Sequence, residues 1–215
     1  AYGSSACLGG SGMFIRHSPS GDRSGASYVV FGGAGVGSTG AIELSAIDGT
    51  NGFVINGELA GDGSGFCVSS AGDVNGDGID DLIIGAYAAD PNGAWSGASY
   101  VVYGGAGVGS TGAVELSAID GSNGFVINGI AAFDFSGRWV SSGGDVNADG
   151  FDDVIVGANG ADPNGSRSGP RSVGYGGPSL APRGTIQLSA AEGSDGFPDQ
   201  RADAVAPSGT PASSH

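Results

Sequence analysis

Short apolar runs, rich in β-branched and aromatic residues and separated by glycine-rich stretches, form the main pattern along the 215-residue chain. Runs of this length and composition favour strands, because an amphipathic helix needs apolar residues at a period near 3.6 over a longer segment. Within one unit of the pattern we expect four strands, which lie at Phe66–Ala71, Asp81–Ala86, Ala98–Tyr103 and Gly124–Asn128. The pattern therefore predicts an all-β fold.

The segments between these runs are rich in turn-forming residues. We expect a loop at Gly72–Asp80, between the first two strands, and a turn at Asp90–Gly93, which has the sequence Asp-Pro-Asn-Gly. The long segment Gly104–Asn123 joins the third and fourth strands. Its part Ala113–Ile119 is compatible with a short helix and with an extended segment, and both alternatives stay open on the sequence.

The whole pattern repeats with an offset of 72 residues. Ser24–Thr50 and Ser96–Ser122 differ at only three positions, and a third, weaker copy begins at Ser168. A four-stranded sheet of this size cannot bury both faces alone, and radial stacking of such sheets gives a β-propeller, which usually has four to eight blades. About three repeats therefore predict a partial propeller of four-stranded antiparallel blades. Its neighbours would be further blades of the parent protein or a second copy of the chain.

The repeat boundaries divide the chain into five segments. We expect a degenerate N-terminal segment at 1–17, a partial blade at 18–61, a blade with an acidic loop at 62–133, a second such blade at 134–197, and a degenerate tail at 198–215. Both end segments depart from the repeat, and we expect both to be poorly ordered.

Two loops of the repeat carry a dense set of oxygen-bearing side chains, at loop positions 1, 3, 5 and 9. Position 6 is glycine, and we expect the chain to turn there in the left-handed region of backbone conformation. In each loop the carbonyl at position 7 is a further expected ligand. The expected ligands are Asp73, Asn75, Asp77, Ile79 and Asp81 in the first loop, and Asp145, Asn147, Asp149, Phe151 and Asp153 in the second. Calcium prefers six to eight oxygen ligands from a sharply folded loop. The sequence predicts two calcium sites, with Asp80 and Asp152 at position 8 facing outward or lying behind the ligands.

Two alternatives to calcium loops fit these residues less well. An EF-hand needs a bidentate Glu at position 12, where this chain has Ile84 and Val156, and a following helix instead of a strand. The other alternative is that Asn-Gly and Asp-Gly are ordinary turn dipeptides. A simple hairpin gains nothing from so many carboxylates, whose mutual repulsion is unfavourable without a counter-ion.

Charge and hydropathy narrow the range of partners. The formal net charge is −15, with 22 acidic residues, seven arginines and no lysine. Such a surface repels nucleic acid and anionic lipid. No apolar run approaches the roughly 20 residues that span a bilayer, so membrane insertion is not expected.

Enzymatic alternatives have weak support in the sequence. Gly35–Gly40 matches the dinucleotide fingerprint G-x-G-x-x-G, but Asp48-Gly49 interrupts the chain before a helix could form. The two histidines, His17 and His215, lie in the degenerate ends, and no serine lies in a nucleophile elbow. We therefore expect that the chain is not an enzyme.

The segment Phe135–Ala158 resembles one FG-GAP repeat of integrin α-subunit propellers and their bacterial relatives, and Val68–Ala86 resembles a second. The resemblance covers roughly residues 24–177. It implies a seven-bladed propeller with calcium in loops between the first two strands of some blades, on an extracellular protein. The chain departs from the family at Gly63, where the family has Phe, and at Tyr87 and Asn159, which replace the Pro of Gly-Ala-Pro.

These observations lead to one functional expectation and one alternative. We expect a calcium-binding propeller module of a secreted or cell-surface protein, in which calcium is structural and the module binds a protein or glycan ligand in adhesion. The alternative is a non-catalytic propeller module of a larger extracellular hydrolase, such as a lipase-like or polysaccharide-degrading enzyme.

Overall fold

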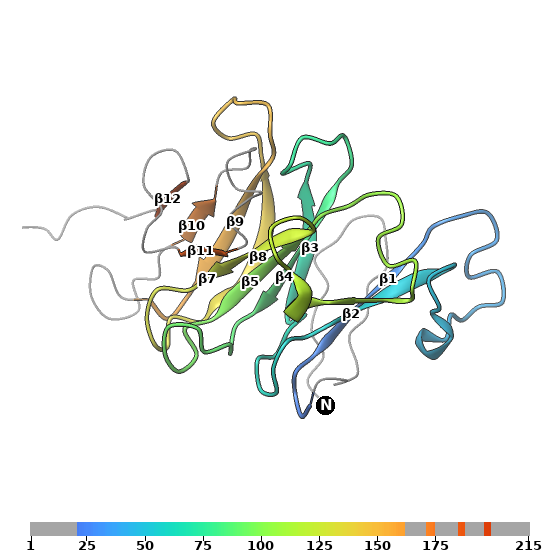
Figure 1. Cartoon of the computed structure of the whole chain (residues 1–215), viewed down its shortest axis with the longest axis horizontal. Coiled ribbons are helices and arrows are strands. Elements are labelled where there is room, and N and C mark those ends of the chain that lie inside the picture. Colours follow the sequence, from blue (N-terminus) through green and yellow to red (C-terminus); the bar gives the residue numbers. More distant parts are fainter. Residues whose placement is uncertain (1–20, 162–170, 175–184, 188–195, 199–215) are drawn as a thin grey trace, which may run out of the picture.

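The computed structural model describes residues 21–161, 171–174, 185–187 and 196–198 (Figure 1). Within these ranges every regular element is a strand or a three-residue 3-10 turn, which confirms the predicted all-β class. None of the described segments is a helix with the length and apolarity to cross a membrane. The expectations for residues 1–17 and 199–215 fall outside the described residues.

The described residues form twelve strands and two 3-10 turns. The strands are β1 (Ala26–Val30), β2 (Gly52–Asn56), β3 (Cys67–Gly72), β4 (Asp81–Ala86), β5 (Ala98–Val102), β6 (Ala113–Glu115), β7 (Gly124–Asn128), β8 (Ser136–Gly144), β9 (Asp153–Ala158), β10 (Arg171–Gly174), β11 (Thr185–Gln187) and β12 (Gly196–Pro198). The 3-10 turns are η1 (Leu44–Ala46) and η2 (Leu116–Ala118).

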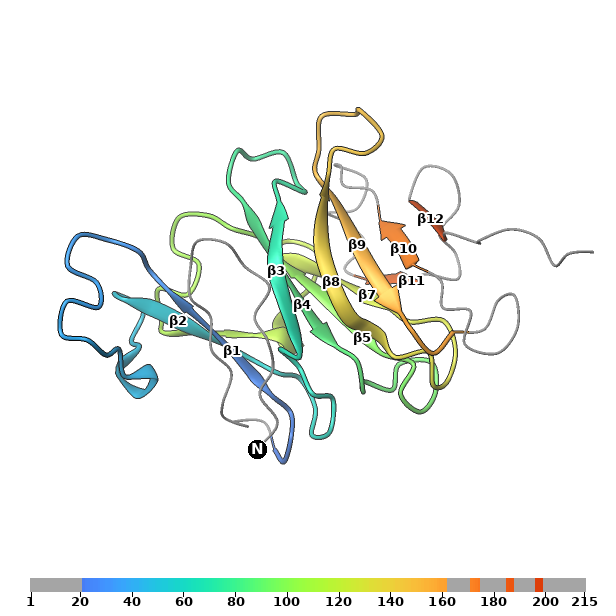
Figure 2. The same cartoon turned by 180° about the vertical axis from the view of Figure 1, so that it is seen from behind.

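Three sheets lie side by side, and each is built mainly from one repeat (Figures 1 and 2). The second blade is the antiparallel set β3-β4-β5-β7, and the third blade is the antiparallel set β8-β9-β10-β12. Of the first blade, the structure describes the antiparallel pair of strands β1 and β2. Two of the four predicted strands, β4 and β7, have the predicted bounds, and β3 and β5 differ from the prediction by one residue at their ends.

The second blade is buried on both faces, because successive side chains of a strand point to opposite sides of the sheet. Ile83 of β4 packs toward the third blade, and the next residue, Ile84, packs toward the first. Both side chains are fully buried. This two-sided burial explains the nearly uninterrupted apolar run of β4, which an exposed sheet would not need.

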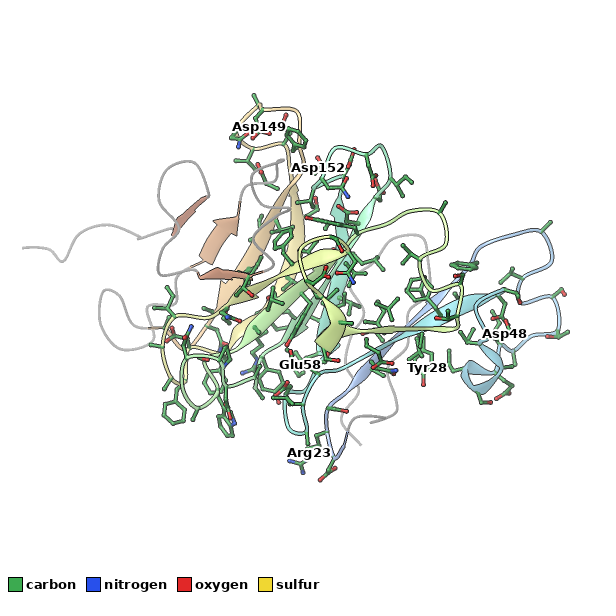
Figure 3. The ribbon with its side chains drawn as sticks, viewed as in Figure 1. Arg23, Tyr28, Asp48, Glu58, Asp149 and Asp152 are labelled. Atoms are coloured by element: carbon green, nitrogen blue, oxygen red, sulfur yellow. The ribbon has the colours of Figure 1, made fainter. Side chains whose placement is uncertain are left out.

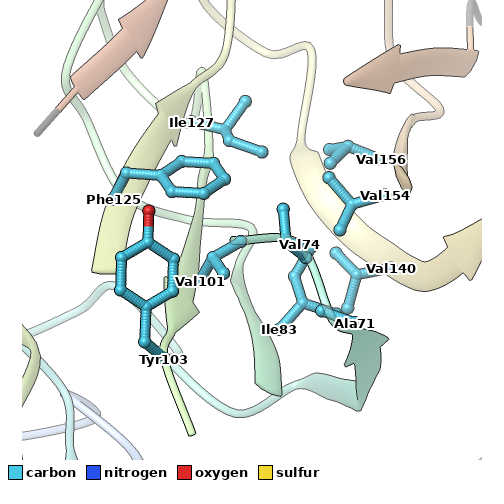
Figure 4. Packing of buried hydrophobic residues seen from close by; sticks show 10 residues of the cluster. All are labelled: Ala71, Val74, Ile83, Val101, Tyr103, Phe125, Ile127, Val140, Val154 and Val156. Atoms are coloured by element: carbon cyan, nitrogen blue, oxygen red, sulfur yellow. The ribbon is translucent and has the colours of Figure 1, made fainter. Parts of the chain in front are cut away.

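Figure 4 shows the apolar cluster between the second and third blades. The second blade contributes Ala71, Val74, Ile83, Val101, Tyr103, Phe125 and Ile127, and the third contributes Val140, Val154 and Val156. The opposite face of the second blade packs against Phe53 and Ile55 of the first. The blades therefore hold together mainly by burial of apolar side chains, at about 1.5–3 kcal/mol for each large residue.

The long excursions of the second and third repeats cross to the preceding blade, and each adds a parallel strand there. Strand β6 pairs with β2, the outer strand of the first blade, and β11 pairs with β7 of the second. In the segment Ala113–Ile119, a strand is followed at once by the turn η2. Each of the two open alternatives for this segment was therefore half right, and pairing with β2 makes its extended part a strand.

The excursions of the first two repeats provide a matched test of this packing. Leu116 is 2% exposed and lies in the cluster with Phe53 and Ile55, whereas its counterpart Leu44 is partly exposed. We expect Leu116→Ala to lower the free energy of unfolding by about 2–5 kcal/mol. Leu44→Ala should lower it by less than about 1 kcal/mol.

Urea denaturation of the full chain measures both values. Equal losses for the two variants would contradict the inter-blade position of Leu116.

Candidate metal centre

The two acidic loops connect the first two strands of the second and third blades. The first loop joins β3 to β4 and the second joins β8 to β9, so both lie at the same end of the sheets (Figure 3). Asp149 and Asp152, labelled in Figure 3, lie in the second loop, with Asp152 toward the first. The repeat thus brings two equivalent loops next to each other in space.

Asp73 closes the first loop through its carboxylate. Its Oδ1 accepts hydrogen bonds from the amides of Gly76 (2.7 Å) and Asp77 (3.0 Å), and its Oδ2 accepts one from the amide of Gly78 (2.8 Å). Asp145 has the same role in the second loop, where it accepts from the amides of Asp149 and Gly150, each at 3.0 Å. The carboxylate at position 1 therefore holds the loop backbone in a turn by accepting hydrogen bonds from the loop amides.

The side chains at positions 3 and 5 lie against each other in both loops. The Nδ2 of Asn75 donates to Oδ2 of Asp77 at 3.2 Å, and Oδ1 of Asp77 accepts from the amide of Ile79 at 2.9 Å. In the second loop the Nδ2 of Asn147 lies 3.0 Å from Oδ2 of Asp149. The side chains of the predicted ligands at positions 3 and 5 are thus in contact in each loop, whereas the position 1 carboxylate binds backbone amides.

The position 9 aspartate forms the buried base of the loop. Asp81 is completely buried, and its carboxylate accepts hydrogen bonds from the amides of Val74 (3.0 Å) and Gly104 (2.8 Å). Burial raises the pKa of Asp81 to about 6, and the charges of Asp77 and Asp73 add to the rise, whereas the two amide hydrogen bonds lower it. An ionised Asp81 is therefore unfavourable in the loop without a nearby positive charge.

The donor set of each loop suits a hard cation, although the side chains are not gathered around one point. Among the residues that the structure describes, no three His, Cys, Asp or Glu side chains are placed so as to hold a metal ion. The carboxylates are instead turned onto the amides of their own loop. An ionised carboxylate has about four acceptor sites, and Asp73 uses three of them, so capacity for a cation remains.

Two loop positions adopt the left-handed region of backbone conformation. The prediction for position 6 is confirmed, since Gly78 and Gly150 have φ values of 84° and 93°. Position 4 was missed, and there Gly76 has φ 79° and Ala148 has φ 61°. The second loop therefore contains an alanine in a conformation that L-residues adopt at a cost of about 1–2 kcal/mol.

Asp152 joins the two loops, a contact that the repeat pattern does not predict. Its Oδ2 accepts from the amide of Asp73 at 3.0 Å, and its own amide donates to the carbonyl of Asp73 at 3.0 Å. Asp80, at the same position of the first loop, is exposed. The exposure of Asp80 agrees with the expectation that position 8 faces outward or lies behind the ligands. Asp152 instead contacts the loop of the neighbouring blade.

The glycine-rich segment Gly35–Gly40 does not have the context of a dinucleotide site. It is a succession of turns, in which the amide of Ser38 donates to Gly35 and the amide of Gly40 donates to Gly37. The element that follows it is the three-residue turn η1. A helix N-terminus, on which such a fingerprint depends, is therefore not formed here.

Comparison with known proteins agrees with this geometry. The family model described as FG-GAP repeat matches residues 68–102 and 136–175, and each match contains one of the two acidic loops. The search of curated proteins finds no match to the chain. The matched ranges begin in the first strand of a blade and extend to or beyond its third, so the repeat corresponds to the loop and its sheet.

Substitutions at position 4 of the two loops should change the free energy of unfolding in opposite directions. We expect Ala148→Gly to raise the free energy of unfolding by about 1 kcal/mol, because glycine adopts φ 61° without strain. Gly76→Ala should lower it by more than about 1 kcal/mol, since the added Cβ would lie 2.3 Å from Cε1 of Phe151. Chemical denaturation in the presence of a chelator measures both, and effects of the same sign would disprove the left-handed assignment.

The bridge between the loops can be tested at position 8. Asp152→Ala leaves the amide of Asp73 without its acceptor, and we expect a loss of about 1–3 kcal/mol in the free energy of unfolding. Asp80→Ala removes the same charge from the same position of the first loop and should change stability by less than about 0.5 kcal/mol. The comparison is made in chelator at one ionic strength. A larger loss for Asp80→Ala would refute the bridge.

Proposed function

We propose, from the two FG-GAP repeats that the chain carries, that it is a calcium-binding β-propeller module of a secreted or cell-surface protein. The observation that supports it best is the repetition of one hydrogen-bond network in both loops. Each loop sets an aspartate, an asparagine and a second aspartate beside one another, above a buried aspartate. Oxygen donors of this kind are those that calcium prefers.

In this proposal each calcium ion is held by one loop. Asp73, Asn75, Asp77, the Ile79 carbonyl and Asp81 would hold the first ion, and Asp145, Asn147, Asp149, the Phe151 carbonyl and Asp153 would hold the second. The ion would supply positive charge to a loop whose carboxylates otherwise repel one another. Its role is structural, since it would stabilise the hairpin that carries the loop.

The buried base of the loop explains why a cation would stabilise the fold. Asp81 has its pKa raised to about 6 by burial, so at neutral pH its ionised form opposes folding. A divalent ion in the loop favours the ionised form and offsets that cost. Asp153 is buried in the same way beneath the second loop, where it accepts from the amide of Val146 at 2.7 Å.

An extracellular setting agrees with the exposure of the loops. Asp77 and Asp149 are both exposed at the end of the sheets, where an ion would keep contact with solvent. Extracellular calcium modules typically bind with dissociation constants of about 10⁻⁴–10⁻³ M, which suits a site of this kind. The chain is proposed to be non-enzymatic, and its role is to present a surface to a ligand.

Exposed aromatic side chains support binding of a protein or glycan. Trp95 and Phe133 are 50% and 57% exposed, and their rings pack edge to face with centroids 6.1 Å apart. Phe135 lies beside Trp95 at 5.6 Å. Aromatic side chains with an apolar face and little conformational entropy are common anchors in binding surfaces. We propose that this group contributes to adhesion through contact with a protein or glycan ligand.

Calcium should raise the melting temperature of the full chain, and a chelator should reverse the change. At a calcium concentration about 20 times the dissociation constant, each site adds about 2 kcal/mol to the free energy of unfolding. Each site should then raise the melting temperature by roughly 4–8 °C. Differential scanning calorimetry with added calcium and with chelator measures the shift.

Variants that remove a loop charge test whether the calcium-dependent shift in melting temperature arises at the loops. Asp77→Asn should lose about half of the calcium response, and the double variant Asp77→Asn with Asp149→Asn should lose nearly all of it. Asp22→Asn removes one charge from an exposed position outside the loops and should keep the full response. The proposal fails if the double variant responds to calcium as strongly as the unaltered chain.

A further inference from the structure

The chain contains eight Asn-Gly pairs, which begin at Asn51, Asn56, Asn75, Asn92, Asn123, Asn128, Asn159 and Asn164. An asparagine followed by glycine is prone to lose its side-chain amide, because the glycine nitrogen, with no Cβ beside it, can attack the side-chain carbonyl carbon. All but the last of these pairs lie in the described part of the chain. They differ in the group that binds the glycine amide, and this difference distinguishes one pair.

Most of these glycines are bound to the main chain. The amides that donate to main-chain carbonyls, at 2.8–3.4 Å, are those of Gly57, Gly93, Gly129 and Gly160. Gly52 and Gly124 begin strands β2 and β7 and are paired there with the adjacent strands. A carbonyl oxygen does not remove a proton from an amide at neutral pH, so none of these bonds prepares the nitrogen for attack.

The amide of Gly76 is bound to a carboxylate instead. It donates to Oδ1 of Asp73 at 2.7 Å, so a base lies within hydrogen-bond reach of the attacking nitrogen. The side chain of Asn75 is held beside it, because its Oδ1 accepts from the amide of Asp77 at 2.8 Å and its Nδ2 donates to Oδ2 of Asp77 at 3.2 Å. The amide of Asp77 therefore polarises the carbonyl under attack and stabilises the negative oxygen that develops there.

The second loop holds the equivalent asparagine without these conditions. Asn147 makes the matching bonds to Asp149, at 2.9 Å to its amide and 3.0 Å to its carboxylate. The next residue, Ala148, has a Cβ, and the hydrogen bonds of this described loop join the Asp145 carboxylate to the amides of Asp149 and Gly150. The two loops are thus a matched pair, in which the first alone presents a glycine amide to the carboxylate at position 1.

We propose that Asn75 is a site of self-catalysed deamidation, assisted by Asp73 and Asp77 and requiring water as its one co-reactant. The nitrogen of Gly76 bonds to Cγ of Asn75, and its proton passes through the Asp73 carboxylate to Nδ2, which leaves as ammonia. The bond from Cγ to Nδ2 breaks in this step, and a succinimide ring remains. Water then opens the ring at either of its carbonyl carbons. The product is aspartate or, where the main chain continues through the side chain, isoaspartate.

Either product changes the first loop. A carboxylate replaces the amide group that donates to Oδ2 of Asp77, so two negative groups then face each other. Isoaspartate also adds a methylene to the main chain just before Gly76, where the backbone turns with φ 79°. The reaction therefore makes two equivalent loops chemically different, and it does so without an enzyme.

Peptide mapping by mass spectrometry, after incubation of the full chain at neutral pH in chelator, tests the site. We expect aspartate and isoaspartate to accumulate at Asn75 about ten times faster than at Asn147 or at Asn92, whose Asn-Gly pair lies in another exposed turn. In denaturant Asn75 and Asn92 should react at equal rates, because the carboxylate is no longer held at the glycine amide. The chelator excludes calcium, so the result is independent of the calcium proposal.

Two variants test whether the folded loop causes this rate. Asp73→Asn keeps a hydrogen-bond acceptor but removes the base, and it should slow the reaction at Asn75 by about tenfold or more. Ala148→Gly creates an Asn-Gly pair in the second loop, and Asn147 should still react more slowly than Asn75. Circular dichroism melts of each variant confirm that it folds.

The proposal is overturned if Asn75 of the folded chain reacts no faster than Asn92, or if Asp73→Asn leaves the rate unaltered. It is also overturned if Ala148→Gly makes Asn147 as reactive as Asn75, since the glycine alone would then decide the rate. Formation of aspartate without isoaspartate would overturn it as well, because direct hydrolysis of the side chain by water does not involve the nitrogen of Gly76.

Discussion

Burial of apolar side chains between adjacent sheets is the interaction on which this structure depends. No sheet of the described chain could be stable alone, because a small four-stranded sheet with two apolar faces leaves one or both in water. The second blade resolves this by placing alternate residues of each strand against a different neighbour, as Ile83 and Ile84 do. The spacing of the repeat, and the crossing of the second and third excursions to the preceding blade, follow from that need.

The same constraint explains why nearly identical repeats differ in structure. Leu116 and Leu44, or Val108 and Val36, have the same local sequence and the same turn after them, yet only the members of the second repeat are covered by a neighbour. The local backbone is set by glycines and turn residues, so it forms in both repeats. Burial depends on the adjacent blade, and the repeats differ where that blade differs.

Local patterns predicted the strands and the loops well, and contacts between repeats poorly. The bounds of β4 and β7 and the left-handed glycine at position 6 follow from composition and spacing. The left-handed conformation of Ala148 could not be inferred from the residue itself, because alanine does not favour it. The indication that the sequence did offer was the alignment of Ala148 with Gly76 in the repeat. The bridge of Asp152 to Asp73 joins residues 79 positions apart, and its formation depends on how two blades pack.

The loops of the chain fold through their own hydrogen bonds, and this limits what an ion would have to do. Asp73 already draws three amides of the loop to its carboxylate, so the turn does not require a metal to hold its shape. What the hydrogen bonds do not remove is the accumulated negative charge above a buried aspartate. A cation would therefore act on the free energy of the folded state more than on its geometry. Since Asp152 fixes the backbone of Asp73, stability gained at one loop would also support the joint between the two blades.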